Sequence, residues 1–265
     1  MILKQPTFHL SAFSASVPTG TAAYTKLAAV SDNVLTTTAG NNLLAGSAYK
    51  IDLAYAGGTN LAACRFVVPS LRDLGRPQLA PVNNAAGTPT VENIYDPGSR
   101  PLTVLAGEEF GLEAYTSDGG SVTVSALTFL RFGDSGAAIG PCYRLRGTAA
   151  IVGSAGVWAS GQITMDDTLT AGTFEIIGLD VVSANTIGAR LIFPNGGLRP
   201  GALARDSIGD VRVDNFSFGK FGSFGQFNNF ALPQLEIYCI GASTAQTVFL
   251  DLVRVSKDSS LTAFV

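Results

Sequence analysis

Two glutamates occupy matching positions in this sequence and could carry acid–base chemistry. Glu113 and Glu236 lie 123 residues apart, and each stands in a Leu-Glu-x-Tyr motif. Two carboxylates that face each other across one cleft can act as general acid and base in glycoside hydrolysis. However, an arginine follows each glutamate at one constant spacing, as Arg131 and Arg254. We therefore predict a structural ion pair in each half, Glu113 with Arg131 and Glu236 with Arg254, because opposite charges on paired strands attract.

A second candidate for chemistry is the tetrapeptide Gly133-Asp134-Ser135-Gly136. It resembles the nucleophile motif of trypsin-like serine proteases, whose serine needs a histidine base and a buried aspartate. The chain has a single histidine, His9, and Ala-Ala-Ile-Gly follows the tetrapeptide where that family has glycine and proline. The sequence therefore predicts no catalytic residue and no enzyme.

Residues that bind transition metals are scarce and scattered. Cys64, Cys142 and Cys239 are the three cysteines, and they share no close spacing with each other or with the histidine. We predict that they are buried small apolar residues rather than a metal site or a disulfide framework.

Acidic residues do not form a recognisable calcium loop either. Asp206, Asp210 and Asp214 recur every four residues, whereas ligands alternate in an EF-hand loop. We interpret these three as solvated loop charges, and a surface calcium ion at Asp166-Asp167 stays open. No glycine loop of the kind that holds phosphates precedes a helix, so we expect no cofactor.

The two glutamates belong to a stretch that occurs twice. Residues 76–132 match residues 199–255 without a gap, and upstream residues 43–69 match 169–194 with small shifts. A repeated unit of this length is a whole domain rather than a solenoid repeat. We predict two related domains joined by a linker at 133–141: residues 1–138, which include an N-terminal arm, and residues 139–265.

Short strands are expected throughout both halves. Between residues 49 and 55, Tyr, Ile, Leu and Tyr alternate with Lys, Asp and Ala, which is typical of a half-buried strand. Residues 110–115 and 122–132 are expected to form a hairpin across Asp118-Gly119-Gly120. No apolar pattern of helical period lasts beyond about two turns. The predicted fold is all-β: two tandem related antiparallel β-sandwiches, jelly-roll-like, that arose by internal duplication.

Composition limits the partners that this chain can have. Charged residues make up 14% of the sequence, the net charge is -3, and no run of Lys or Arg occurs, so we expect no direct nucleic-acid binding. No apolar stretch is long enough to span a membrane, and we expect no signal peptide. A weakly charged exterior favours close contact with neighbouring subunits.

One aromatic segment departs from the repeat. Six phenylalanines follow a step of about three residues, which fits neither a strand nor an α-helix: Phe216, Phe218, Phe221, Phe224, Phe227 and Phe230. Aromatic anchors are typical of subunit interfaces, so the segment is a candidate contact. Two other interpretations stay open: the rings close the core of the second sandwich, or they stack on bases.

Taken together, these features resemble double jelly-roll major capsid proteins of viruses and phages, at the level of architecture. The resemblance implies a subunit that assembles with itself, as a trimer of pseudo-hexagonal outline, and with other virion proteins. It also implies synthesis in the host cytoplasm and a final location in the virion. No motif carries functional residues over from the family.

A tandem β-sandwich binding module is the alternative. Decoration, spike or tail-fibre proteins of this kind bind carbohydrates or proteins, and sugar-binding faces commonly present aromatic platforms. Trp158 is the single tryptophan, and Tyr95 and Tyr143 are further candidate aromatics. The two functions differ in whether the protein assembles or responds to a glycan.

Overall fold

The chain folds into two compact units in the computed structural model. The structure describes residues 3–18, 23–74, 94–117, 121–134, 136–194, 197–210 and 213–256. Leu10–Phe132 form the N-terminal unit, while Met1–His9 and Gly133–Val265 form the C-terminal unit. The division falls at the beginning of the expected linker, and the first nine residues group with the C-terminal unit rather than with the sequence that follows them.

In its described residues, the N-terminal unit consists of strands and one short 3-10 helix. The strands join in the order β3-β8-β2-β1-β9-β4-β6, with β5 paired to β8 and β7 to β4. Only two residue pairs join β1 to β2, so the network divides into two parts. One part is β1-β9-β4 with β6 and β7 on β4, and the other is β2-β8 with β3 and β5 on β8. The elements are β1 (Phe8–Val17), β2 (Thr25–Ala29), β3 (Leu43–Leu44), β4 (Tyr49–Gly57), β5 (Leu61–Val67), η1 (Pro69–Leu74), β6 (Ile94–Tyr95), β7 (Leu102–Val104), β8 (Glu109–Thr116) and β9 (Val122–Arg131).

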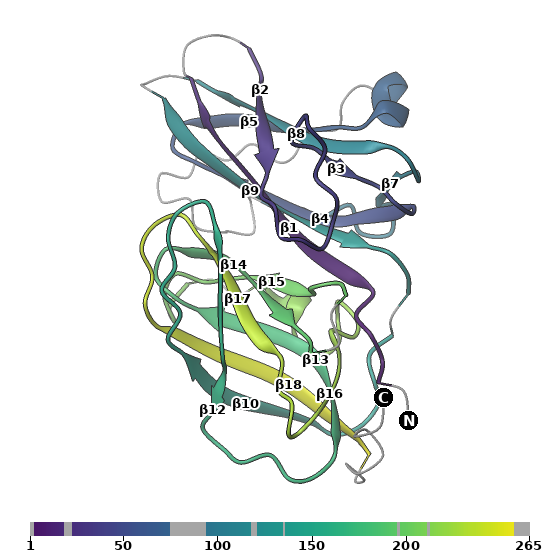
Figure 1. Cartoon of the computed structure of the whole chain (residues 1–265), viewed down its shortest axis with the longest axis vertical. Coiled ribbons are helices and arrows are strands. Elements are labelled where there is room, and N and C mark those ends of the chain that lie inside the picture. The colour runs from purple at the N-terminus through teal and green to yellow at the C-terminus, as the bar shows by residue number, and fades with distance from the viewer. Residues whose placement is uncertain are drawn as a thin grey trace. The chain divides into compact units, whose positions relative to one another are not determined.

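The C-terminal unit has two separate sheets (Figure 1). One sheet has the order β12-β10-β18-β13-β16, and the other has the order β11-β17-β14-β15. The elements are β10 (Cys142–Ala149), β11 (Trp158–Gly161), β12 (Thr164–Met165), β13 (Thr173–Val182), β14 (Thr186–Ile192), β15 (Gly201–Leu203), η3 (Asp214–Phe216), β16 (Gly225–Asn228), β17 (Gln234–Cys239) and β18 (Gln246–Ser256).

This strand order is that of a jelly roll. Without the two-residue strand β12, the eight strands of the C-terminal unit, counted along the chain, lie in the orders 1-8-3-6 and 2-7-4-5. In the N-terminal unit, β1-β9-β4-β7 and β2-β8-β5 follow the same arrangement, and the two-residue strands β3 and β6 have no counterpart in it. The expected all-β, sandwich-like fold is confirmed.

The two units also share their strand register. In β4 a bulge falls between Ile51 and Leu53 where it pairs with β9, and in β13 a bulge falls between Ile176 and Gly178 where it pairs with β18. The β5–β8 and β14–β17 pairs likewise each contain one irregularity, after Leu61 and after Thr186. Each bulge bends and twists its strand, so matching bulges give the two units matching local geometry.

The expected hairpin between residues 110–115 and 122–132 is wrong. Both segments are strands, β8 and β9, but β8 pairs with β2, β3 and β5, while β9 lies between β1 and β4. Asp118-Gly119-Gly120, the expected turn, lies outside the described residues. The same separation holds for β17 and β18, which belong to different sheets. In each unit these two consecutive strands join different neighbours instead of pairing with each other.

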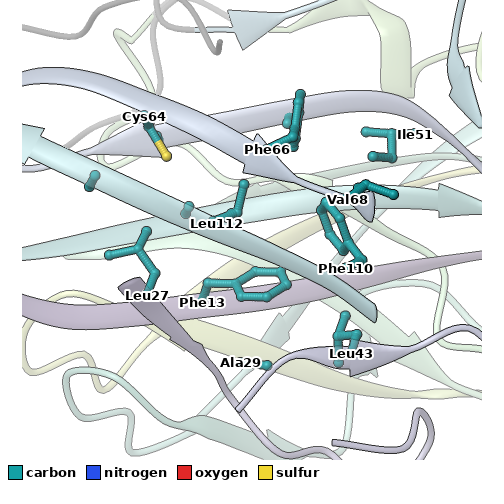
Figure 2. Close-up of a cluster of buried hydrophobic side chains, with 14 of the residues drawn as sticks. Phe13, Leu27, Ala29, Leu43, Ile51, Cys64, Phe66, Val68, Phe110 and Leu112 are labelled. Atoms are coloured by element: carbon teal, nitrogen blue, oxygen red, sulfur yellow. The ribbon is translucent and has the colours of Figure 1, made fainter. Parts of the chain in front are cut away.

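Aromatic residues from separate strands meet in the core of the N-terminal unit (Figure 2). Phe13 of β1 and Phe66 of β5 both contact Phe110 of β8, with ring centroids 5.5 and 5.8 Å away. All three rings are fully buried. Burial of each such side chain contributes roughly 1.5–3 kcal/mol, so strands far apart in sequence are held together here.

The cysteines have different environments. Cys64 lies in this core and Cys239 is buried in the C-terminal unit, as predicted, whereas Cys142 at the beginning of β10 is exposed, contrary to prediction. Burial raises the pKa of the Cys64 thiol to about 12.

In the described part of the chain, no helix is both long enough and apolar enough to cross a membrane.

Candidate functional site

Glu113 faces Arg65 and not the predicted Arg131. Arg65 of β5 lies directly opposite Glu113 of β8, and its Nε and Nη2 atoms donate to the Glu113 Oε2 atom at 2.9 and 2.7 Å. The guanidinium carbon of Arg65 lies 3.6 Å from the centre of the Tyr24 ring, a cation–π contact. Tyr24 in turn contacts Tyr115, with ring centroids 6.0 Å apart. The Arg65 guanidinium therefore contacts both the carboxylate of Glu113 and the aromatic ring of Tyr24.

The C-terminal unit repeats this cluster. Arg190 of β14 lies directly opposite Glu236 of β17 and donates to its Oε2 atom at 2.5 Å. The guanidinium carbon of Arg190 lies 3.7 Å from the centre of the Trp158 ring, and Trp158 contacts Tyr238 at 5.2 Å. Each member thus has a counterpart in the N-terminal unit. Glu113 and Tyr115 are 123 residues before Glu236 and Tyr238, and Arg65 is 125 residues before Arg190.

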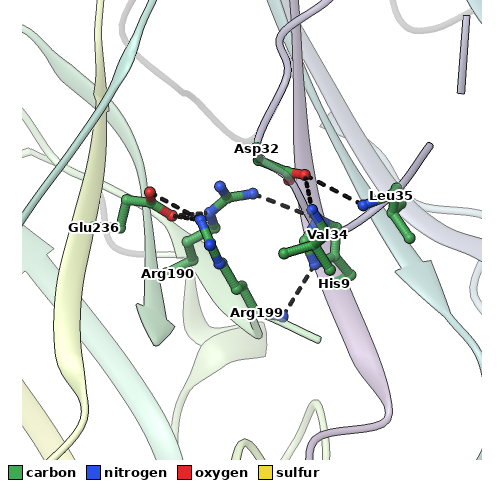
Figure 3. Close-up of polar contacts among 7 residues, drawn as sticks. All are labelled: His9, Asp32, Val34, Leu35, Arg190, Arg199 and Glu236. Atoms are coloured by element: carbon green, nitrogen blue, oxygen red, sulfur yellow. Dashed lines mark hydrogen bonds and ion pairs between the residues drawn. The ribbon is translucent and has the colours of Figure 1, made fainter. Parts of the chain in front are cut away.

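A second arginine strengthens the C-terminal cluster (Figure 3). The Nη1 atom of Arg199 donates to both carboxylate oxygens of Glu236, at 3.0 and 2.9 Å. The side chain of Glu236 is 9% exposed and that of Arg190 is 0% exposed, against 21% and 23% for Glu113 and Arg65. Hydrogen bonds from arginine reach both Glu236 oxygens, an arrangement that joins β14 to β17 and to the segment that contains Arg199.

His9 also belongs to the C-terminal cluster. Its Nδ1 atom accepts a hydrogen bond from the backbone N–H of Arg199 at 3.0 Å, and its Nε2 atom lies 3.4 Å from the Nη1 atom of Arg190 (Figure 3). A ring nitrogen that accepts a hydrogen bond carries no proton, so this contact fits a neutral imidazole. His9 is therefore a buried structural residue that joins the N-terminal segment to the C-terminal unit.

The predicted arginines have other partners. Arg131 pairs with Asp52, the bulge residue of β4, and Arg254 donates to the backbone carbonyl of Ala171. The structure thus assigns Glu113 to Arg65 and Glu236 to Arg190 and Arg199, in place of the cross-strand pairs with Arg131 and Arg254. The reason is that each glutamate and its predicted arginine lie on strands that do not pair with each other.

The six phenylalanines of the aromatic segment divide into two groups. Four are buried in the C-terminal unit, with exposed fractions of 9% or less: Phe216, Phe221, Phe224 and Phe227. Phe221 and Phe224 contact Phe8 of the N-terminal segment edge to face, with ring centroids 4.9 and 5.0 Å away. Phe218 and Phe230 are 57% and 80% exposed. Most of the segment therefore closes a core, and two rings remain candidates for an intermolecular contact.

Phe218 has an unusual backbone. Its φ angle is +50°, while the four other non-glycine residues described with positive φ are all asparagines. A bulky side chain in this left-handed region costs on the order of 1–3 kcal/mol, so neighbouring contacts must hold the conformation.

Asp251 of β18 supplies those contacts. It is fully buried, and its carboxylate accepts hydrogen bonds from Arg144 Nε at 2.7 Å, Arg144 Nη2 at 2.9 Å and the Phe218 backbone N–H at 2.9 Å. The guanidinium carbon of Arg144 also lies 4.8 Å from the centre of the Phe218 ring. One buried carboxylate therefore orients both the strained residue and the cation beside it.

The remaining acidic candidates have local roles. The carboxylate of Asp206 accepts the backbone N–H of Asn185, in the turn between β13 and β14, and that of Asp210 accepts the backbone N–H of Ser207 in its own loop. Asp166 pairs with Arg146 at 2.8 Å. Asp214 lies 3.9 Å from Lys220. Among the described residues, no three His, Cys, Asp or Glu side chains converge as metal ligands would. Ser135 of the protease-like tetrapeptide lies outside those residues.

Surface hollows occur in both units. One of about 390 Å³ in the N-terminal unit includes Glu108 and Glu109 in its lining. Another of about 460 Å³ in the C-terminal unit has an uncharged lining of small and neutral polar residues: Thr148, Ala149, Ala150, Gly161, Gln162 and Thr164.

Compared with known protein families and with curated proteins, the sequence matches none.

Proposed function

We propose that this protein is a structural virion protein, a major capsid subunit that assembles with itself into a shell. The observation that carries the proposal is the jelly-roll strand order of the C-terminal unit, which β1-β9-β4-β7 and β2-β8-β5 follow in the described part of the N-terminal unit. Viral capsid domains are prominent users of this architecture. Two similar units in one chain give a trimer six similar lobes, which suits hexagonal packing.

The surface of the protein supports this proposal. Only 14% of the residues are charged, and several large apolar side chains are exposed in the described parts of both units, such as Leu105, Ile139 and Val152. Contacts between such surfaces bury apolar and neutral polar area without burying unpaired charges. In this function the partners are further copies of the chain and other virion proteins.

The arrangement of charged groups favours structure over catalysis. The two repeated clusters place an arginine between a carboxylate and an aromatic ring, and in the C-terminal unit both glutamate oxygens accept from arginines. Trp158, the candidate sugar platform, contacts Arg190 and Tyr238 instead of standing apart as a flat exposed face. The binding-module alternative therefore has less support than assembly.

Light scattering of the purified protein across a concentration range tests the proposal, followed by negative-stain imaging of the largest species. We expect discrete trimers that give way to lattice fragments or shells as the concentration rises. A protein that stays monomeric at every concentration would contradict the capsid proposal. If such a monomer also gained thermal stability from a glycan, the binding-module function would replace the capsid proposal.

A further inference from the structure

We propose that Phe218 is the anchor of a head-to-tail contact between two copies of this chain, and that its ring enters the uncharged hollow beside Thr148 in the next copy. This inference rests on the proposed self-assembly and names the residues that would carry it. Phe218 supplies one side of the contact. The hollow lined by Thr148, Ala149, Ala150, Gly161, Gln162 and Thr164, here called the neutral hollow, supplies the other.

The exposure of Phe218 is built into the structure. An aromatic residue that only filled space would be expected in an ordinary conformation, with its ring turned inward. Phe218 instead has a φ angle of +50° and a ring that is 57% exposed. The Asp251 carboxylate accepts a hydrogen bond from the backbone N–H of Phe218. The backbone N–H of the next residue, Gly219, donates to the carbonyl of Ile177 at 2.7 Å. Strain that is maintained by a buried charge is typical of functional positions.

The strand arrangement itself does not require a buried carboxylate at the position of Asp251. In the N-terminal unit the first facing pair after the bulge consists of two apolar residues, Leu53 and Phe129. At that place in the C-terminal unit, Gly178 faces Asp251. A Cβ atom on Gly178 would lie 2.2 Å from the Asp251 carboxylate, so the glycine makes room for the charge that orients Phe218. The C-terminal unit thus has a glycine and a buried carboxylate at a place where the N-terminal unit has two apolar residues.

The neutral hollow suits a phenyl ring from another copy. Its lining carries no charge, whereas the hollow in the N-terminal unit includes two glutamates, Glu108 and Glu109, which a ring would bury at a cost. Phe218 lies beside Arg144, near the beginning of β10, and the hollow begins at Thr148, four residues further along the strand. That separation is roughly 13 Å along the strand. Phe218 is not among the residues that line the hollow of its own unit.

Two different patches that fit each other form a heterologous contact, which closes into a ring when the rotation between copies allows it. A ring of three copies would give the trimer of the proposed function. The aromatic side chain in a pocket would be the main source of its affinity.

Disulfide trapping in the full-length chain tests the contact directly. A Cys142→Ser background removes the exposed thiol. Lys220→Cys, at an exposed position two residues from Phe218 that leaves the Phe218 ring in place, and Gln162→Cys are introduced separately and together. We expect covalent dimers and trimers on non-reducing gels from the double variant under mild oxidation. Mixing the two single variants should give a covalent heterodimer, while each single variant alone stays monomeric on the gel. If the double variant assembles as the background protein does and forms no such link, the inference is wrong.

A second comparison separates this inference from the proposed function. Phe218→Ala should raise the concentration for half-assembly at least tenfold, while Phe230→Ala, which removes a more exposed ring of the same segment, should leave it unchanged. Circular dichroism should show unchanged strand content for both. If assembly survives Phe218→Ala at the original concentration, the contact is refuted and the capsid proposal stands. If the unmodified protein never assembles, both fail.

Discussion

Arg190 lies directly opposite Glu236 in the paired strands β14 and β17, and its guanidinium lies 3.7 Å from the centre of the Trp158 ring. The same relationship joins Arg65 and Glu113 in the N-terminal unit. The C-terminal pair is more deeply buried, so the two clusters allow matched experiments on one interaction at two levels of solvent exposure.

Glu236→Gln should destabilise the C-terminal unit by about 3–5 kcal/mol, because two arginines near a buried site lose their countercharge. Glu113→Gln should cost about 1 kcal/mol or less, because its pair is partly solvated. Trp158 is the single tryptophan and lies in the C-terminal cluster, so its fluorescence during urea unfolding reports the first value. Circular dichroism reports the second. Equal losses in the two variants would show that burial does not control the strength of these pairs.

Arg65, rather than Arg131, should couple energetically to Glu113. In double-mutant cycles with alanine, we expect a coupling energy of about 0.5–1 kcal/mol for Arg65 with Glu113. For Arg131 with Glu113 the effects should add to within about 0.5 kcal/mol, since Arg131 pairs with Asp52. Urea unfolding of the six proteins measures both cycles. A larger coupling for Arg131 would restore the pairing predicted from sequence.

Gly178→Ala should destabilise the C-terminal unit by about 1–3 kcal/mol, because the new methyl group meets the carboxylate of Asp251. Gly136→Ala is the matched control: a Cβ atom there meets nothing within 4 Å, so the change should be within about 0.5 kcal/mol. Thermal unfolding followed by tryptophan fluorescence compares the two. Equal melting temperatures would mean that Asp251 can move without loss.

Phe8→Ala should destabilise the C-terminal unit although Phe8 lies at the opposite end of the sequence. Its buried ring contacts Phe221 and Phe224, and its loss should cost about 3–5 kcal/mol. Phe230→Ala, at an exposed ring, should cost less than about 0.5 kcal/mol. Urea unfolding followed by Trp158 fluorescence measures both variants. An unchanged midpoint for Phe8→Ala would show that the N-terminal segment is not part of this unit.

Only one thiol of the native protein should react readily with a thiol reagent at pH 8. Burial raises the pKa of Cys64 to about 12 and also raises the pKa of Cys239, so both stay protonated and covered. Cys142 is exposed, but desolvation and then Asp251 raise the pKa of its thiol. A raised pKa means less thiolate at a given pH, so the rate for Cys142 should reach half its maximum at a higher pH than in the urea-unfolded protein. Cys142→Ser should abolish the fast reaction, and a second fast thiol in that variant would contradict the predicted burial.

Several features were predictable from local pattern. Alternating residues between positions 49 and 55 indicated a strand, and β4 occupies that place. The constant spacing of 123 residues identifies Glu113 and Glu236 as equivalent positions. Arg65 and Arg190 also recur at a constant spacing, of 125 residues, and this pattern could have identified the correct partners. The aromatic segment was recognised as an exception, but its spacing did not distinguish Phe218 and Phe230 from the buried rings.

The sequence by itself determined the class of fold, the positions of the strands expected at residues 49–55, 110–115 and 122–132, and the recurrence of charged and aromatic residues. These properties depend on neighbours along the chain, because alternation and turn residues act over a few positions. Tertiary structure alone decided which arginine meets which glutamate, where Phe8 packs and which phenylalanines are exposed. These contacts depend on which sheet each strand joins, and that choice is made by the burial of apolar surface between segments that are not neighbours in the sequence.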